Sequence, residues 1–487
     1  MYMSGLSYTK VISGTKWSTL TEILAKLVSP VTTMVLARIL TPEDFGVLVT
    51  ATMVISFAEI FTDAGFQKYL IQHEFTDEQD RYKTTTTAFW SNLTLSLLIW
   101  VVIIIFAKPL ADLVGNPGKG DVIAAAGACI PLAAFSSIQM ALYKRDLDFK
   151  TLFRVRVIGV CVPLVVTIPL AFITRSYWAL IAGMFILNLS NALFLTIFSS
   201  WKPNRYFSWT RLKSMLSFSI WSVLEAVSIW LTNYADMFIV GTLLSSHFLG
   251  IYRTSISIVG QIMSIITAST LPVLYSSLSR LQDNKEDYNR FFLKFQKNVA
   301  YFVVPLGIGI FLFKDFITNI LLGSQWSEAA GFVGIWALTS SVVIVMSYYT
   351  SEVCRSKGKP LISFISQVIH LVFLIPVIII SARNGFETLY YSRSLIRLQA
   401  VIVDLIILFL LTGLTPIKIA GNVIKPYFAA SVMAGLYFML PSLPPTSFWM
   451  NILYVVACGA TYLLVLMTFS SERRNFKMLA THLTDRR

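Results

Sequence analysis

Long stretches of almost purely hydrophobic residues alternate with short polar segments along the whole chain. Each stretch has roughly the 20 residues that an α-helix needs to cross a bilayer, which is too long for a membrane strand. Lipid offers no hydrogen bonds to exposed backbone groups, so we expect each stretch to be a helix and the protein to be an all-α polytopic membrane protein. The fourteen stretches cover residues 17–37, 45–70, 84–107, 121–143, 155–174, 177–198, 212–243, 247–277, 295–313, 330–352, 360–381, 388–413, 423–440 and 447–469.

The composition agrees with this pattern. Of the 487 residues, 56% are hydrophobic and 13% are charged. A soluble domain carries about 25% charged residues, and a chain this apolar would expose large hydrophobic patches to water. The connections between stretches are too short to hold a folded soluble domain.

The distribution of positive charge predicts the orientation. Net charge is +14, and if the fourteen stretches alternate from a cytoplasmic N-terminus, 29 of the 39 Lys and Arg residues fall on the cytoplasmic side and 9 on the other. Such an asymmetry is the positive-inside rule, and it places both termini in the cytoplasm. The charge therefore indicates anionic membrane lipids as partners and argues against nucleic acid.

Two segments resemble each other at a fixed offset of 204 residues. Residues 14–48 align without a gap to residues 218–252, so that Trp17 meets Trp221 and Gly46 meets Gly250. The copies open the first and the seventh stretch, which predicts a parallel repeat about an axis along the membrane normal. We therefore predict four regions: an N-lobe of six helices (1–205), a C-lobe of six helices (206–415), a helix pair (416–470) and a cytoplasmic tail (471–487).

The repeated segment contains a helical hairpin. Thr41 is suited to cap a helix that starts at Pro42, and acidic residues follow at the positive end of that helix. Gly46 and Gly250 lack side chains, so we expect a close approach between helices at both positions.

Three segments carry a family likeness: ARILTPEDFGVL (37–48), FTDAGFQKYLIQ (61–72) and DMFIVGTLLSSHFLGIYRTS (236–255). They resemble bacterial polysaccharide flippases of the Wzx type, which serve O-antigen, exopolysaccharide or teichuronic acid synthesis. These flippases belong to the multidrug/oligosaccharidyl-lipid/polysaccharide exporter superfamily. Beyond residue 300 only the topology matches, without a sharp motif.

The resemblance implies a function in the bacterial inner membrane. The expected substrate is an undecaprenyl-pyrophosphate-linked oligosaccharide, moved from the cytoplasmic to the outer leaflet by alternating access and driven by an ion gradient. It implies no enzyme activity, with polysaccharide polymerase or export machinery as possible partners. No cofactor is expected: GNPGKGD (115–121) lacks the Gly-Lys-Ser/Thr ending of a phosphate loop and is interpreted as a turn.

Ionisable residues inside the stretches are the candidate functional residues, because they are costly in lipid. Cations suited to a pyrophosphate are Lys26, Arg253, Arg393 and Arg397. Groups that could couple transport to protons or sodium are Glu22, Glu59, Asp63, Glu225, Asp236, His370 and Asp404. The structural alternative is pairing within the protein, such as Glu22 with Lys26 or Asp236 with Arg253. Arg393 and Arg397 could instead snorkel to the outer surface.

Three other classes of protein stay open. A peptidoglycan lipid flippase would also have fourteen spans, and a drug/cation antiporter of the same superfamily would fit twelve spans better. A polytopic glycosyltransferase or polymerase would need a large loop outside the membrane, whereas the connections here are short.

Overall fold

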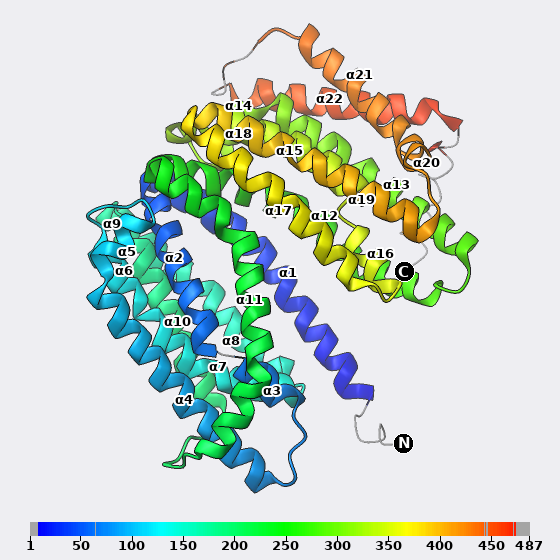
Figure 1. The fold of residues 1–487 in the computed structure, drawn as a ribbon. Helices are drawn as coiled ribbons and strands as arrows, with labels where there is room; N and C mark the ends of the chain where they lie inside the picture. The colour runs from blue at the N-terminus through cyan, green and yellow to red at the C-terminus, as the bar shows by residue number, and fades with distance from the viewer. Residues whose placement is uncertain (1–7, 64, 443, 445–446, 471, 474–487) are drawn as a thin grey trace. The chain divides into compact units, whose positions relative to one another are not determined.

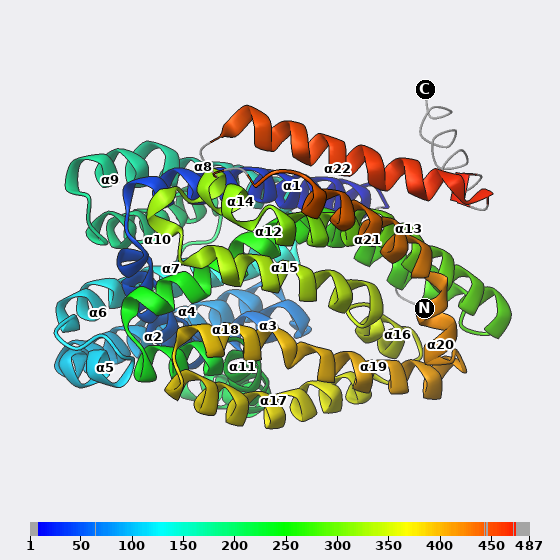
Figure 2. The same ribbon diagram turned by 90° about the horizontal axis from the view of Figure 1, so that it is seen from above.

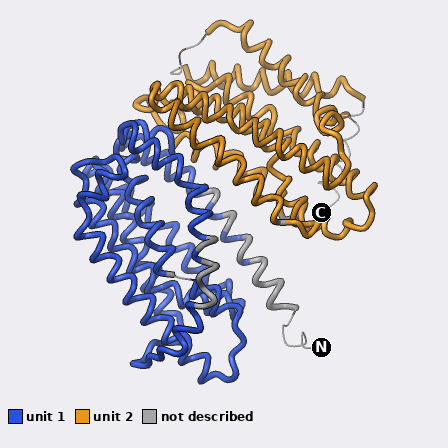
Figure 3. Tube along the Cα trace, viewed as in Figure 1, with its two compact units in different colours: residues 1–253 blue, residues 254–487 orange. Residues whose placement is uncertain are grey.

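The computed structural model describes residues 8–63, 65–442, 444, 447–470 and 472–473. Within these ranges the positions of some side chains are not described. They include those of four predicted site residues: Glu22, Lys26, Asp63 and Glu225. The chain forms two compact units, residues 1–253 and 254–487 (Figure 3). Every regular element in the described ranges is a helix, as the hydrophobic pattern predicts (Figure 1).

Unit 1 contains the helices up to the first turns of α12. They are α1 (Tyr8–Ile39), α2 (Pro42–Asp63), α3 (Phe66–Gln72), α4 (Glu78–Ile105), α5 (Ala107–Leu113), α6 (Gly120–Gly127), α7 (Cys129–Arg145), α8 (Phe149–Val162), the π-helix η1 (Pro163–Thr167), α9 (Ile168–Thr174), α10 (Trp178–Phe198), α11 (Trp209–Leu243) and the start of α12 (Ser246–Arg280). Helices α4 and α10 both pack against α7, and α11 packs against α2.

Unit 2 contains the rest of α12 and all later helices. They are α13 (Lys285–Leu312), α14 (Lys314–Leu321), the 3₁₀ turn η2 (Ser324–Trp326), α15 (Ala329–Met346), α16 (Thr350–Ser356), α17 (Pro360–Arg383), α18 (Phe386–Leu395), α19 (Arg397–Thr412), α20 (Pro416–Asn422), α21 (Ile424–Met439) and α22 (Phe448–Thr468). Helix α13 packs against α15 and α21, and α21 lies beside α22 in both views (Figure 2).

Eleven helical segments in the described ranges are long and apolar enough to cross a membrane. They coincide with eleven of the fourteen predicted stretches. The other three stretches are also helical: α1 covers 17–37, α11 covers 212–243, and α21 covers most of 423–440 with 16 residues. The protein is therefore a multi-pass membrane protein.

The hairpin between α1 and α2 has the predicted cap. The Asp44 carboxylate accepts hydrogen bonds from the Thr41 backbone N–H at 2.9 Å and from its hydroxyl at 2.8 Å. The Thr41 hydroxyl oxygen in turn accepts from the Asp44 N–H at 3.3 Å, which closes a reciprocal capping box. The second carboxylate oxygen of Asp44 accepts from the Tyr177 N–H at 2.9 Å, so the cap also fixes the start of α10.

Within unit 1 the first turns of α2 and α12 touch through glycine. A Cβ atom on Gly46 would lie 1.8 Å from the carbonyl oxygen of Ser246, and a Cβ on Gly250 would lie 1.8 Å from that of Pro42. No side chain fits in either place, so the predicted close approach at both glycines is confirmed. Each glycine faces the first residue of the other helix, and both pairs are related by the offset of 204 residues.

Residues 115–119 of the segment GNPGKGD form a turn, as predicted, whereas its last two residues already belong to α6. Gly115 and Gly118 have φ values of 80° and 81°, which favour glycine. A Cβ on Gly115 would lie 1.5 Å from the Gly241 carbonyl oxygen, so the turn rests directly on the backbone of α11. The buried Asn116 amide donates to the Thr50 hydroxyl at 2.7 Å, which also anchors the turn to α2.

A buried carboxylate, Glu472, lies just beyond the end of α22 and packs within unit 2. Glu472 is fully buried and accepts hydrogen bonds from Lys297 Nζ at 2.7 Å, from Lys425 Nζ at 3.2 Å and from the Tyr301 hydroxyl. These partners lower the pKa of the Glu472 carboxyl to about 2, although its burial acts in the opposite direction. The contacts join Glu472 to α13 and α21.

Candidate functional site

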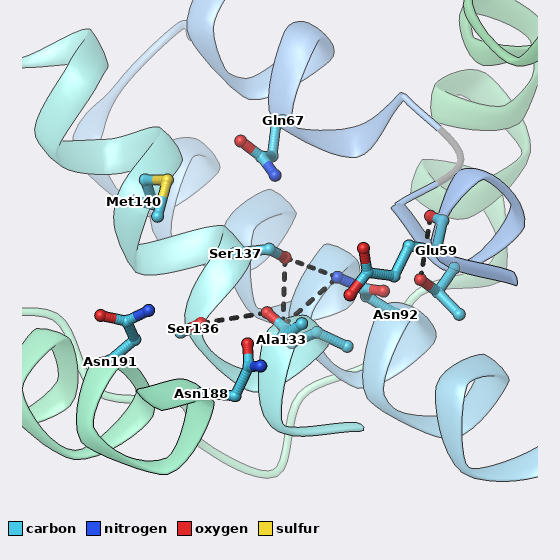
Figure 4. Close-up of a pocket in the computed structure, with 11 residues that line it drawn as sticks. Glu59, Gln67, Asn92, Ala133, Ser136, Ser137, Met140, Asn188 and Asn191 are labelled. Carbon is cyan, nitrogen blue, oxygen red and sulfur yellow. Dashed lines mark hydrogen bonds between the residues drawn. The ribbon is translucent and has the colours of Figure 1, made fainter. Parts of the chain in front are cut away.

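A polar cavity of about 280 Å³ lies inside unit 1, between α2, α3, α4, α7 and α10 (Figure 4). Most of its lining side chains are carboxylate, amide or hydroxyl groups, although the surrounding helices are long and apolar. Polar residues in membrane helices face the bundle interior or a water-filled space, and these follow that rule. The lining residues are Glu59, Thr62, Gln67, Asn92, Ala133, Ala134, Ser136, Ser137, Met140, Asn188 and Asn191.

Asn92 on α4 is the most constrained polar residue of the cavity. Its side chain is completely buried, and its amide nitrogen donates to Ser137 Oγ at 2.7 Å and to the Ala134 carbonyl at 3.3 Å. These two bonds fix the direction of the amide group. The Oδ1 atom is buried and has no hydrogen-bond partner in the described ranges. Such an acceptor is normally satisfied by water or a ligand.

The other polar side chains of the walls keep acceptor capacity. Thr62, Ser136 and Ser137 donate their hydroxyl protons to the carbonyls of Glu59, Ala133 and Ala134 at 3.0 to 3.1 Å. The Asn188 amide donates to the Met184 carbonyl at 3.0 Å. Hydroxyl and amide oxygens have lone pairs left after such bonds, so the cavity can accept several hydrogen bonds from a guest.

Glu59 is the ionisable residue of the lining, and neither Lys nor Arg contributes to the described walls. Glu59 and Gln67 both lie in the stretch 45–70, which the sequence predicts to be one helix. Instead, Gly65 has a φ of 75° and separates α2 from α3, so Gln67 approaches the cavity from a second helix. Both side chains are half-buried, which leaves the cavity accessible.

Of the four predicted cations, the three whose side chains are described, Arg253, Arg393 and Arg397, do not line this cavity. The Lys26 side chain lies outside the described residues. Arg253 is half-buried on α12, and in the described ranges it makes no ion pair with Asp236. The buried Asp236 accepts instead from the Tyr252 hydroxyl and from the Met237 N–H, both at 2.8 Å.

Arg393 and Arg397 share one aromatic partner in unit 2. Their guanidinium carbons lie 5.0 and 3.9 Å from the ring centre of Trp336, which is buried in α15. Arg397 also donates to Ser340 Oγ at 2.8 Å. A break at Ile396 separates α18 from α19 and lies between the two arginines. Both side chains are half-buried against α15 rather than fully extended toward a surface.

The remaining acidic and imidazole candidates have partners from neighbouring helices. Asp404 on α19 accepts from Ser366 Oγ at 2.7 Å and from the hydroxyl of Ser347. His370 Nδ1 lies 3.1 Å from Gln399 Oε1. The side chains of Glu22, Asp63 and Glu225 lie outside the described residues. Glu59 is thus the described candidate that contributes to the cavity.

Three residues central to the cavity escaped the sequence analysis: Asn92, Asn188 and Asn191. The two asparagines of α10 are three residues apart and share one helix face. A search of every stretch for neutral amides, rather than for charges, would have found them. Asn92 has no second amide residue near it on α4. Its place in the site follows only from its hydrogen bond to α7.

The comparison with known proteins identifies the family. Residues 35–331 match the model of the family described as "Polysaccharide biosynthesis protein", which is more than half of the chain. The chain belongs to this polysaccharide biosynthesis family. It is 24% identical over 335 residues to the succinoglycan biosynthesis transport protein ExoT of Rhizobium meliloti, covering 68% of this chain and 67% of ExoT. It is 20% identical over 382 residues to the lipopolysaccharide biosynthesis protein WzxC of Escherichia coli, covering 77% and 75%.

The fold of this protein also occurs in transporters whose structures have been solved. The lipid II flippase MurJ in an inward closed conformation matches with a TM-score of 0.70 and 14% identity, covering 93% of this chain and 98% of MurJ. An inward-facing multidrug resistance MATE transporter of the MOP superfamily matches with a TM-score of 0.58 and 14% identity, covering 82% and 95%. The chain is therefore a polysaccharide biosynthesis protein similar in sequence to ExoT and WzxC, as the sequence predicts, and it shares its fold with MurJ and with a MATE transporter of the MOP superfamily.

Proposed function

We propose that this protein is a flippase for a lipid-linked oligosaccharide in the bacterial inner membrane. It moves an undecaprenyl-pyrophosphate-linked repeat unit from the cytoplasmic to the outer leaflet for exopolysaccharide or lipopolysaccharide assembly. The main support is the fold: a chain of a polysaccharide biosynthesis family matches a lipid II flippase over 93% of its length. A lipid-linked sugar also suits a multi-pass protein with polar groups between its helices.

The proposed architecture has fourteen spans with both termini in the cytoplasm. Lobes at 1–205 and 206–415 alternate in access, and a helix pair at 416–470 is added to them. The reciprocal contact of Gly46 and Gly250 supports the repeat, because a two-fold relation predicts equivalent contacts at equivalent positions. Polysaccharide polymerase or export proteins would receive the product.

Charged residues inside the helices are proposed to serve transport. Lys26, Arg253, Arg393 and Arg397 would attract the pyrophosphate, and arginine suits phosphate because its guanidinium can bind two oxygens. The acidic candidates and His370 would couple the cycle to protons or sodium. A charge-reversal variant tests the first role: if Lys26→Glu supports normal polymer export at a normal protein level, Lys26 does not contact the substrate.

A peptidoglycan lipid flippase is the second candidate function, favoured by the TM-score of 0.70 to the lipid II flippase. Deletion of the gene separates the two. If cells stay viable, lose one surface polymer and accumulate its lipid-linked repeat unit, the polysaccharide function is supported. Lysis with accumulation of the peptidoglycan precursor would support the second function. If no lipid-linked sugar accumulates, both proposals fail.

A further inference from the structure

The size of the unit 1 cavity restricts what it can hold. A water molecule occupies about 30 Å³ in the liquid, so about 280 Å³ corresponds to roughly nine waters. This volume greatly exceeds that of one dehydrated metal ion. It lies just below the range of about 300–1,000 Å³ that is typical of small-molecule sites, which suits a guest of the size of a single pyranose ring.

The charge of the described lining does not suit an anionic guest. Glu59 supplies negative charge, and neither Lys nor Arg lines the described walls. A pyrophosphate brought into this space would lose its hydration and meet a carboxylate, both of which are unfavourable. The cavity is therefore suited to a neutral part of a substrate and not to its phosphates.

The hydrogen-bonding groups of the walls match a polyhydroxylated guest. Asn92 Oδ1 and the Glu59 carboxylate are acceptors, and Oδ1 needs a donor that the described residues do not supply. Across the space, Gln67, Asn188 and Asn191 carry amides that both donate and accept (Figure 4). Each hydroxyl of a sugar also donates and accepts, so one ring can satisfy several of these groups together.

We infer that this cavity binds one uncharged sugar residue of the carried glycan. This inference rests on the proposed flippase function, because it gives the glycan and the pyrophosphate separate places on the protein. Asn92 accepts from a sugar hydroxyl through Oδ1, and the Glu59 carboxylate accepts from a second hydroxyl. The side chains that line the cavity then help to determine which glycan the protein carries.

Protection of an introduced cysteine tests binding without any transport. Met140 lines the cavity, and Met140→Cys is made in the full chain with Cys161→Ser, because Cys161 is the exposed one of the four free cysteines. Labelling by N-ethylmaleimide is followed in membrane vesicles with methyl glycosides of neutral hexoses. At a glycoside concentration about five times its dissociation constant, the labelling rate should fall about sixfold. Single sugars bind weakly, so the range to test is millimolar.

Controls separate the possible guests. Inorganic pyrophosphate should not protect Met140→Cys. In the wild-type chain, which keeps Cys161 on α8, no glycoside should protect that cysteine. Asn92→Leu should abolish protection by glycoside, whereas Asn384→Leu should not, because Asn384 is exposed and donates to the Ile380 carbonyl outside the cavity. Gln67→Cys provides a second reporter on another wall if Met140→Cys reacts slowly.

The outcomes are distinguishable. If no glycoside protects either reporter, the inference is overturned. If sodium or a change of pH protects them and glycosides do not, the cavity holds a coupling ion and the inference is likewise overturned. If glycosides protect while deletion of the gene accumulates no lipid-linked sugar, the sugar site stands and the flippase proposal fails instead.

Discussion

Gly46 on α2 and Gly250 on α12 each lie against the carbonyl of the residue that begins the other's helix. The two contacts are equivalent, with the same distance of 1.8 Å from a notional Cβ to an oxygen. Neither helix can move to relieve one contact without disturbing the other. The glycines therefore act as a pair. The offset of 204 residues that relates them in the sequence corresponds to two equivalent helix contacts in the structure.

Substitution of either glycine should destabilise unit 1. Gly46→Ala and Gly250→Ala each force a methyl group into backbone atoms, so we expect the free energy of unfolding to fall by about 1–3 kcal/mol. Thermal unfolding of the purified protein in detergent measures the change. Gly260→Ala is the control, because a Cβ there meets no atom within 4 Å on the same α12. Equal stability of all three variants would contradict the packing described here.

Removal of the Glu472 carboxylate should destabilise the packing of α13 and α21 within unit 2. Glu472→Gln leaves Lys297 and Lys425 without their buried counter-charge, and charged hydrogen bonds of this kind contribute about 1.5–3 kcal/mol. We expect a lower melting temperature at pH 7. Glu286→Gln, an exposed change in the first turn of α13, should have no effect.

The same carboxylate predicts a pH dependence of stability. The pKa of Glu472 is lowered in the folded protein from an ordinary value of 4.5 to about 2. Its contribution is therefore complete above about pH 5 and is lost as the pH falls from there toward 2. The difference in melting temperature between wild type and Glu472→Gln should shrink over that range. A difference that stays constant down to the lowest pH would argue against an ionised Glu472.

Arg397 should not tolerate lysine. Its guanidinium stacks on Trp336 and donates to Ser340 from one planar group, a combination that an ammonium cannot reproduce. We expect Arg397→Lys to reduce polymer export to about a tenth, the effect of losing about 1.4 kcal/mol, at an unchanged protein level. Arg290→Lys is the control, because its ion pair with Asp287 is exposed and contributes little. Full export with Arg397→Lys would show that only the charge is needed.

Arg145 should be needed to hold the end of α3. One guanidinium nitrogen donates to the carbonyls of Leu70 and His73 at 2.7 Å and to that of Ile71 at 3.1 Å. Arg145→Ala leaves these acceptors without their donor, so we expect faster proteolysis after residue 72 in the purified, detergent-solubilised protein. Lys150→Ala, an exposed change on α8, should be cut at the wild-type rate. The same cutting pattern in both variants would refute the role of Arg145.

The hydrophobic pattern predicts the helices well because lipid leaves the backbone little choice. The apolar stretches, the Thr41 cap and the two glycines follow from rules that act within a few residues. Breaks inside a stretch are harder to foresee: Gly65 divides the second stretch, and Ile396 interrupts the twelfth although it is itself apolar. Such breaks depend on packing against helices that are distant in the sequence.

The candidate site was predicted only in part, for a physical reason. Charge is costly in lipid and therefore conspicuous in a sequence, so Glu59 was found. A neutral amide costs less, and its role depends on which helices meet it. Asn92 takes its direction from Ser137 and Ala134 on α7, a contact that no spacing within α4 reveals.

The position of Glu472 has a consequence for protein engineering. Its carboxylate accepts from Lys297 on α13 and from Lys425 on α21, so both lysines depend on a residue that lies beyond α22. A shortened variant that ends at Thr468 would remove this shared counter-charge and weaken the packing of α13 against α21. Fusion partners and affinity tags should therefore be attached so that residue 472 is kept.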